Sequence, residues 1–264
     1  YFLKFASEFS SQKLKMMNLI RPRLVTFDVT GTLLMTALEV HYTEIGSLHG
    51  ISMDSKKLVT SFKNNFHKLA QDHPIFGKTT GLGWQNWWRT IVYNVFRDQD
   101  KNSSEKTLDK VADHLIECYG TKKCWHKYPD TLKILNYLKK QDVVLGVISN
   151  FDSRLESVLV STELRPYFSF VLTSYDFGSE KPDPTIFEEA LRRSKPYSNT
   201  SIQPHEALHI GDTYDRDYLG AKNANWNAIL IKRDSKQKID LAKYKLESNR
   251  DSVLTLFEKK STFT

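Results

Sequence analysis

The fold of this chain is constrained most by five short runs of apolar, strand-forming residues. Within each run the apolar side chains follow one another with few polar interruptions, as they do in strands that are buried on both faces of a parallel sheet. The runs occupy residues 24–27, 143–148, 168–173, 207–210 and 228–231. They predict a buried parallel sheet at the centre of the protein.

Helical patterns of crossover length separate the last four runs. One follows Asp152, and a second begins at Asp183-Pro184, where the aspartate suits an N-cap and the proline suits the first turn. A third extends from about Asp215 to Asn225. Strands that alternate with helices in this way predict a doubly wound α/β sheet.

The segment between the first two runs is too long for one crossover, and its patterns are helical. Asp54 and Ser103 are predicted N-caps, and Gly50 and Gly120 are predicted helix ends. Three apolar stripes recur at helical spacing, which predicts an all-helical insertion soon after the first strand. The stripes are Leu58, Phe62, Phe66 and Leu69; Trp84, Trp87, Trp88, Ile91 and Val95; and Leu108, Val111, Leu115 and Ile116.

Polar residues suited to metal and phosphate chemistry lie at the ends of these runs. Asp28 follows the first run, Ser149 ends the second, and Asp212 follows the fourth, with Asp217 five residues later. Lys181 precedes the helix that begins at Asp183-Pro184. In an open α/β sheet, ligands bind beyond the carboxyl ends of the strands, so we expect these side chains to converge there. Such a set can hold a divalent cation through oxygen ligands and a phosphoryl group through hydroxyl and ammonium donors.

With these residues in this order, the sequence resembles the haloacid dehalogenase superfamily of phosphohydrolases. The resemblance covers residues 20–230 and implies a Rossmann-like core with an inserted helical cap that closes over the site. Asn225 stands where the superfamily usually has glycine, and asparagine is the next best residue for a left-handed helix end. The strings that carry the resemblance are FDVTGTLL, WQNWWR, VISNFDSRL, VLTSY, KPDPTIFEEAL and HIGDTYDRDYLGA.

The resemblance also implies the role of each candidate residue. Asp28 would be the nucleophile that forms an aspartyl-phosphate, and Mg²⁺ would be held by Asp28, Asp212 and the backbone carbonyl of Thr30. Asp217 would contribute to the metal site by orienting Lys181 or a metal-bound water. The implied catalytic residues are Asp28, Thr30, Ser149 and Lys181; the implied phosphate-binding residues are Thr32, Ser149, Asn150 and Lys181; and the implied metal residues are Asp28, Thr30, Asp212 and Asp217.

Thr30 departs from the phosphatases of this superfamily, which usually have a second aspartate there as general acid and base. General acid–base catalysis is typically worth about 10²–10⁴-fold, so its absence predicts slow turnover. Three hypotheses for the function therefore stay open. The first is a Mg²⁺-dependent phosphohydrolase that acts on a small phosphorylated metabolite, the second is a binding or regulatory protein that turns over little, and the third is a true dehalogenase.

The predicted core comprises residues 18–37 and 127–250, the cap comprises residues 38–126, and residues 1–17 and 251–264 are predicted tails. Trp84 and Trp88 either pack between cap and core or line the substrate side. Residues 151–154 either face the pocket or form a helix start, with Asp152 as N-cap and Arg154 on the surface. The substrate specificity is expected to lie in the cap and in residues 36–39.

Composition limits the partners and the compartment. The net charge is +7, but the excess of basic residues lies at the two ends of the chain, so nucleic-acid binding is not expected. No apolar run reaches the roughly 20 residues that span a membrane, so no membrane partner is expected. The two cysteines, Cys118 and Cys124, suit a reducing compartment. We expect a cytoplasmic protein, with mitochondrial and nuclear locations and the oligomeric state left open.

Overall fold

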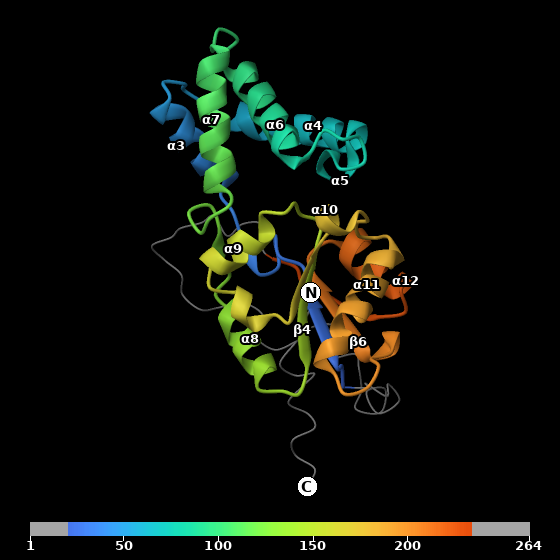
Figure 1. Cartoon of the computed structure of the whole chain (residues 1–264). Coiled ribbons are helices and arrows are strands. Elements are labelled where there is room, and N and C mark those ends of the chain that lie inside the picture. Colours follow the sequence, from blue (N-terminus) through green and yellow to red (C-terminus); the bar gives the residue numbers. More distant parts are fainter. Residues whose placement is uncertain (1–20, 234–264) are drawn as a thin grey trace, which may run out of the picture.

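The computed structural model describes residues 21–233 and contains one central parallel sheet (Figure 1). Its strand order is β5-β4-β1-β6-β7, and every neighbouring pair is parallel. This confirms the predicted doubly wound α/β fold. The predicted tails and residues 18–20 and 234–250 of the predicted core lie outside the described residues. The strands are β1 (Leu24–Phe27), β4 (Val144–Ser149), β5 (Phe170–Thr173), β6 (Ala207–Gly211) and β7 (Asn227–Leu230).

Helices cover both faces of the sheet, which explains why the strands are almost continuously apolar. On one face Val25 and Phe27 pack with residues of α8 and α9, whereas on the other Leu24 packs with residues of α11 and α12. Successive side chains of a strand point to opposite faces, so both sets must be apolar. These helices are α8 (Thr131–Lys139), α9 (Leu155–Ser161), α11 (Pro184–Ser194) and α12 (Gly220–Asn223), and α10 (Ser174–Phe177) and short 3₁₀ turns at Arg165–Tyr167, Lys195–Tyr197 and Pro204–Glu206 complete this part.

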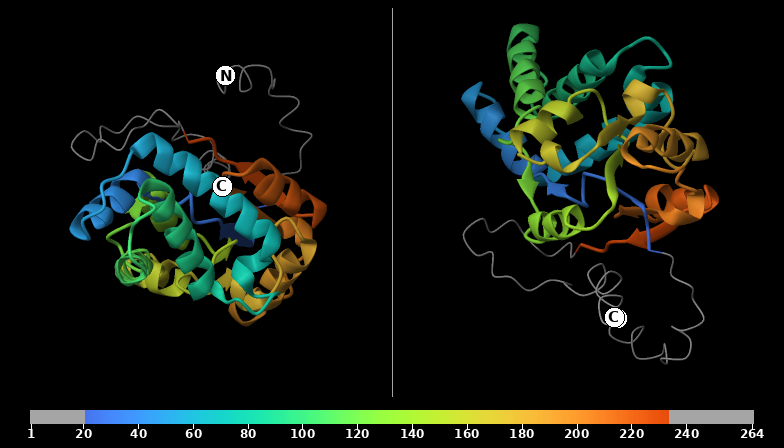
Figure 2. Two further views of the ribbon diagram at one scale, coloured as in Figure 1. Left: turned by 90° about the horizontal axis from the view of Figure 1, so that it is seen from above. Right: turned by 60° about the horizontal axis from the view of Figure 1, so that its bottom comes forward.

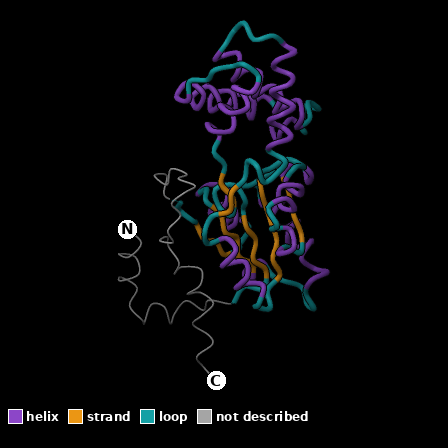
Figure 3. Tube along the Cα trace, turned by 90° about the vertical axis from the view of Figure 1, so that its left-hand side faces the viewer, coloured by secondary structure: helices purple, strands orange, loops and turns teal. Residues whose placement is uncertain are grey.

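The insertion after β1 is helical, as predicted, and we call it the helical block. It packs around a separate hydrophobic core that includes Leu58, Trp87, Phe96 and Leu108. The block stands beyond one end of the strands (Figure 3) and covers that end of the sheet when seen from above (Figure 2, left). Its helices are α3 (Leu38–Leu48), α4 (Ser55–Asp72), α5 (Pro74–Gly77), α6 (Trp84–Gln99) and α7 (Glu105–Cys118).

A short antiparallel ribbon joins the helical block to the sheet. The chain leaves through β2 (Leu34–Met35) and returns through β3 (His126–Lys127), and the two strands pair with each other. Because both crossings lie side by side, the two covalent connections of the block to the sheet lie at one place. Of the predicted cap boundaries, residue 38 begins α3 and residue 126 begins β3. The division into two domains stays a prediction.

The helix ends confirm some predicted caps and correct others. Asp54 accepts hydrogen bonds from the N–H groups of Lys56 and Lys57, and Asp183 accepts one from Thr185, so both are N-caps as predicted. The prediction of Ser103 is wrong by one residue. Ser104 caps α7 instead, because the Ser103 hydroxyl donates to Asp100 Oδ2.

Two further predicted helix starts differ from the structure. Asp152 is not an N-cap, because α9 begins only at Leu155 and the Asp152 carboxylate bonds to Arg154 instead. The third predicted helix begins with a π-helical turn, Tyr214–Leu219, before α12. Asn225 has a φ of 62°, which confirms its predicted left-handed conformation.

No helix within residues 21–233 is both long and apolar enough to cross a membrane. The predicted cytoplasmic location stays a prediction.

The Gly146→Ala substitution is expected to destabilise the sheet. Gly146 in β4 lies opposite Phe170 in β5, and a Cβ on Gly146 would come within 2.4 Å of the Phe170 ring. Relieving this overlap requires movement in a packed core, so the free energy of unfolding should fall by about 1–3 kcal/mol. Urea denaturation measures this change. The double variant Gly146→Ala/Phe170→Leu should lose less stability than the sum of the single variants, and strict additivity would contradict the contact.

Candidate active site

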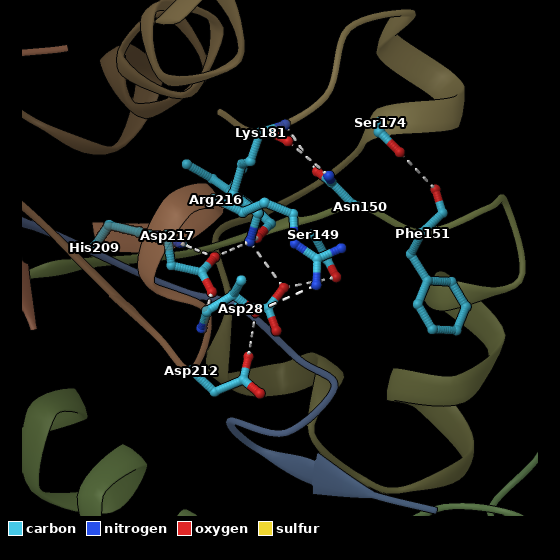
Figure 4. Close-up of polar contacts among 12 residues, drawn as sticks. Asp28, Ser149, Asn150, Phe151, Ser174, Lys181, His209, Asp212, Arg216 and Asp217 are labelled. Carbon is cyan, nitrogen blue, oxygen red and sulfur yellow. Dashed lines mark hydrogen bonds and ion pairs between the residues drawn. The ribbon is translucent and has the colours of Figure 1, made fainter. Parts of the chain in front are cut away.

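The strand order brings three polar strand ends together. Asp28 follows the central strand β1, and its N–H donates to the carbonyl of Ile210 in the neighbouring strand β6. Ser149 ends β4 on the other side of β1, and Asp212 follows β6. The structure thus gathers Asp28, Ser149 and Asp212 at the carboxyl edge of the sheet, together with Lys181 and Asp217 (Figure 4).

Lys181 is the hub of this cluster. It lies in the loop between α10 and α11 and is only 2% exposed. Its Nζ donates to Asp28 Oδ1 at 2.8 Å, to Asp217 Oδ1 at 2.5 Å and to the Ile148 carbonyl at 2.8 Å. Burial lowers the pKa of Lys181, but the carboxylates of Asp28 and Asp217 raise it more, so the pKa lies above its ordinary value. The buried ammonium therefore stays protonated, with all three protons donated.

Asn150 holds the backbone of Lys181. Its amide group donates to the Lys181 carbonyl at 2.9 Å, and its Oδ1 accepts from the Lys181 N–H at 2.8 Å. The sequence prediction assigned Asn150 to phosphate binding. In the structure its side chain holds the backbone of Lys181, and the predicted role in phosphate binding stays a prediction.

Asp28 keeps one carboxylate oxygen free of the described hydrogen-bond donors. The Ser149 hydroxyl donates to Asp28 Oδ1 at 3.1 Å, and Lys181 bonds to the same oxygen. Within residues 21–233 no side chain or N–H donates to Asp28 Oδ2. A carboxylate that is held through one oxygen and open at the other has the geometry of a positioned nucleophile or metal ligand.

The three aspartates form an acidic cluster. One carboxylate oxygen from each of Asp28, Asp212 and Asp217 lies within 4.8 Å of the others. Gly31 permits this approach, because it has a φ of +81° and a Cβ there would come within 2.2 Å of Asp212 Oδ2. Partial removal from water raises the pKa of Asp212 to about 6, and the charges of Asp28 and Asp217 add to that rise. One lysine does not neutralise three carboxylates, so the cluster suits a hard cation with oxygen ligands.

Asp217 already uses both of its oxygens within the protein. Oδ1 contacts Lys181 and His209 Nε2, the latter at 3.1 Å, and Oδ2 accepts from the N–H of Thr213 at 2.8 Å. Burial raises the pKa of Asp217, but Lys181 and His209 lower it far more, so the pKa lies well below the ordinary range. These contacts match the predicted orienting role better than direct metal binding.

His209, which was not among the predicted site residues, is fully buried beneath this site. Burial lowers its pKa, and the charge of Lys181 lowers it further, so the ring is neutral. Its Nε2 lies 3.1 Å from Asp217 Oδ1, and a carboxylate oxygen only accepts, so Nε2 carries the proton and Nδ1 accepts from the Thr26 hydroxyl at 2.8 Å. The signal was present in the sequence, because His209 and Thr26 are polar residues inside apolar strand runs.

Thr30 and Thr32, both predicted site residues, differ in exposure. Thr30 is exposed in the turn after Asp28. Thr32 is fully buried, its N–H donates to the Val29 carbonyl, and its hydroxyl has no partner among the described residues. The predicted contact of Thr32 with phosphate stays a prediction.

Arg216 is a rim cation that the sequence analysis did not single out. It is exposed on the π-helical turn, and its Nη2 donates to the Thr213 hydroxyl at 3.3 Å. The same hydroxyl donates to Asp212 Oδ1 at 3.2 Å. Arg216 is therefore linked to the acidic cluster and adds positive charge at its edge.

The tryptophans of α6 contact the segment that follows Ser149. Trp88 Nε1 donates to Asp152 Oδ2 at 2.7 Å, and the same carboxylate pairs with Arg154. The Arg154 guanidinium lies over the rings of Trp84 and Trp88, at 4.9 and 5.3 Å from their centres. The predicted alternative that places Arg154 on the surface is wrong, because the Arg154 side chain is only 10% exposed. Trp84 and Trp88 thus take part in packing between the helical block and the rest of the protein.

Comparisons with known proteins agree with this geometry. The rhythmically expressed gene 2 protein of Drosophila melanogaster is 38% identical over 246 residues, which cover 90% of this chain and 93% of that protein. The haloacid dehalogenase-like hydrolase domain-containing protein 3 of Mus musculus is 32% identical over 214 residues, with coverages of 80% and 82%. A solved 2-haloacid dehalogenase from Pseudomonas syringae pv. Tomato DC3000 is 26% identical with a TM-score of 0.56, and the match covers 83% of this chain and 91% of that one.

A family model gives the same assignment over most of the described residues. The model of the haloacid dehalogenase-like hydrolases matches residues 22–225, a span that includes Asp28, Ser149, Lys181 and Asp212. Strand-end acids at the carboxyl edge of a doubly wound sheet, together with this match, show that the chain belongs to the haloacid dehalogenase-like hydrolases.

Proposed function

We propose that this protein is a Mg²⁺-dependent phosphohydrolase that acts on a small phosphorylated metabolite through an aspartyl-phosphate on Asp28. One observation carries the proposal: Asp28 is held through Oδ1 by Ser149 and Lys181, and its Oδ2 is free of described donors next to Asp212. A nucleophile must be fixed in place yet keep a lone pair toward the substrate.

The proposed reaction has two steps at phosphorus. An oxygen of Asp28 forms a bond to phosphorus, and the bond from phosphorus to the leaving oxygen breaks; the leaving alkoxide takes a proton from solvent water and departs as the alcohol. Water then attacks the aspartyl-phosphate and regenerates the Asp28 carboxylate with release of inorganic phosphate. Both steps bring anions together, so they need nearby positive charge. Lys181 is the buried cation that fits this need, and Asn150 and Asp217 keep it in place.

Asp28 and Asp212, with the Thr30 carbonyl that family resemblance implies, are the proposed ligands of Mg²⁺. The acidic cluster and its excess negative charge fit a small divalent ion that prefers oxygen ligands. When bound, Mg²⁺ neutralises part of the negative charge that builds up on the phosphoryl group. Asp217 acts through Lys181, because both of its oxygens are already engaged.

The helical block serves as the cap in this proposal. It stands over the edge of the sheet that carries Asp28 and is joined to it by the β2–β3 ribbon (Figure 1). Such a placement suits a lid that excludes water and contacts the part of the substrate beyond the phosphoryl group. Residues 36–39, which comprise the link after β2 and the first two residues of α3, are the proposed specificity segment.

A second candidate is a phosphate-binding regulatory protein with little turnover. Thr30 supports it, because this exposed threonine occupies the position where related phosphatases carry their acid–base aspartate. A hydroxyl is a poor acid and a poor base near neutral pH. Dehalogenation, which the name of the Pseudomonas syringae neighbour raises, is less favoured, since attack at carbon needs no cation and the acidic cluster suits one.

The main test is a screen of small phosphorylated metabolites in the presence of Mg²⁺. The proposal expects repeated, Mg²⁺-dependent release of inorganic phosphate from at least one compound. Asp28→Asn should reduce that rate by about a thousandfold or more, because the variant lacks the nucleophile. Release that stops at one phosphate per protein favours the regulatory reading, and release of halide from haloacids without Mg²⁺ favours the dehalogenase.

Asp212→Asn is expected to stabilise the metal-free protein and to abolish its stabilisation by Mg²⁺. The pKa of Asp212 is raised to about 6, so its ionised form costs stability above that pH. At pH 7.5 without metal, the melting temperature of the variant should be a few degrees above that of the wild type. This difference in melting temperature should become smaller as the pH falls through about 6. Mg²⁺ should raise the melting temperature of the wild type but not that of Asp212→Asn.

Asp215→Asn is the matched control for this experiment, because Asp215 is an exposed aspartate three residues further along, in the π-helical turn. It should respond to Mg²⁺ as the wild type does. Equal stabilisation of Asp212→Asn and wild type by Mg²⁺ would place the metal elsewhere.

Thr30→Asp is expected to speed up hydrolysis of the aspartyl-phosphate. With an activated phosphate donor, the wild type should show a burst of one leaving group per protein followed by slow turnover. The new carboxylate can activate water, so steady-state turnover should rise by about one to two powers of ten. Rapid-quench kinetics separate the two phases. Thr30→Asn, which lacks the acid, should stay slow, and a wild type without a burst would contradict this account of Thr30.

A further inference from the structure

We propose that Cys118 and Cys124 form a redox-active dithiol that a small disulfide such as oxidised glutathione converts to an intramolecular disulfide. Both residues are free thiols, and their Sγ atoms lie 2.8 Å apart. They are the only two cysteines of the sequence. The proposal concerns a site apart from Asp28 and does not depend on the proposed phosphohydrolase activity.

The local fold brings the two sulfurs together. Cys118 is the last residue of α7, and Cys124 lies two residues before β3, so the chain must turn back between them. The Thr121 hydroxyl donates to the Cys118 carbonyl at 2.9 Å, and the Trp125 indole N–H donates to the Tyr119 carbonyl at 2.9 Å. These two hydrogen bonds hold the turn between Cys118 and Trp125 in place.

A third contact fixes the turn to the rest of the protein. The N–H of Lys122 donates to the hydroxyl of Ser161, the last residue of α9, at 2.7 Å. The two thiols are therefore held at short range by a structured segment. A preorganised pair reacts with a much higher effective concentration than two thiols on a flexible chain.

The two cysteines differ in exposure, which gives them different roles in the proposed reaction. Cys118 is partly exposed and accepts a hydrogen bond from the Cys124 thiol, whereas Cys124 is fully buried. Burial and the neighbouring Cys118 sulfur raise the pKa of Cys124, so this thiol keeps its proton. In the proposed order Cys118, the more exposed residue of the two, reacts with the oxidant first, and the enclosed sulfur of Cys124 reacts second.

The chemistry balances in two exchange steps. The Cys118 thiolate attacks oxidised glutathione, which forms a mixed disulfide and releases one glutathione thiolate. Cys124 then loses its proton and attacks the Cys118 sulfur, which forms the Cys118–Cys124 disulfide and releases a second glutathione thiolate. Overall, two protein thiols are oxidised and one glutathione disulfide is reduced to two glutathione thiols.

The position of the two cysteines determines which segments their disulfide would link. Cys118 ends the last helix of the helical block, and Cys124 lies where the chain returns toward the β2–β3 ribbon. A disulfide would therefore tie the end of α7 to the segment that leads into β3, where the chain returns from the block to the sheet.

The test treats the full chain with oxidised glutathione under native conditions, followed by rapid alkylation and intact-mass analysis. The expected product is a monomer that has lost two hydrogen atoms, carries no glutathione and has no alkylatable thiol. Cys124→Ser should stop at a glutathione adduct on Cys118, and Cys118→Ser should react at least about tenfold more slowly, because its remaining thiol is buried.

The same reaction in guanidinium chloride measures the effect of the fold. Ring closure after the mixed disulfide forms should be at least about tenfold faster in the native protein than in the unfolded chain at the same pH. A stable glutathione adduct on native wild type, with Cys124 still alkylatable, would overturn the proposal. So would a native protein that keeps both thiols while the unfolded chain is oxidised.

Discussion

The burial of one ammonium group among carboxylates is the interaction on which the structure of the site depends. Lys181 is removed from water at a cost that only close anionic and carbonyl partners offset. Asp28, Asp217 and the Ile148 carbonyl supply those partners from β1, the turn after β6, and β4. The contacts that neutralise the lysine therefore also join three segments that are distant in sequence. Losing either carboxylate would leave the buried ammonium of Lys181 with one anionic partner instead of two.

The helical block contacts the segment after Ser149 through a second buried ion pair, that of Asp152 with Arg154. Asp152 and Arg154 follow Ser149 closely in sequence, and Trp88 of α6 donates to the Asp152 carboxylate. The position of the block and the segment that leads from Ser149 into α9 therefore depend on one another. Together with the β2–β3 ribbon, this contact sets where the block stands over the carboxyl edge of the sheet.

The candidate site was predictable to the extent that each residue follows a recognisable strand. Asp28, Ser149 and Asp212 were found because parallel strands end at one edge. His209 was not among the predicted site residues because its role depends on a neighbour eight residues later, and the burial of Thr32 was not predicted. Asn150 was placed in the right cluster, but its amide bonds to the Lys181 backbone. Local patterns do not reveal which partner a polar side chain selects.

The sequence by itself determined the parallel sheet, the helical insertion and the order of the strand-end acids, because hydrophobic period and strand-end chemistry are local properties. Its local signals were also enough for the caps at Asp54 and Asp183 and for the left-handed Asn225. Only the tertiary structure decided that Asp152 pairs with Arg154 and Trp88, that Asp217 bonds to His209, and that Cys118 meets Cys124. Each of these contacts requires packing to bring two side chains to one point, and buried polar groups take whichever partners that packing offers.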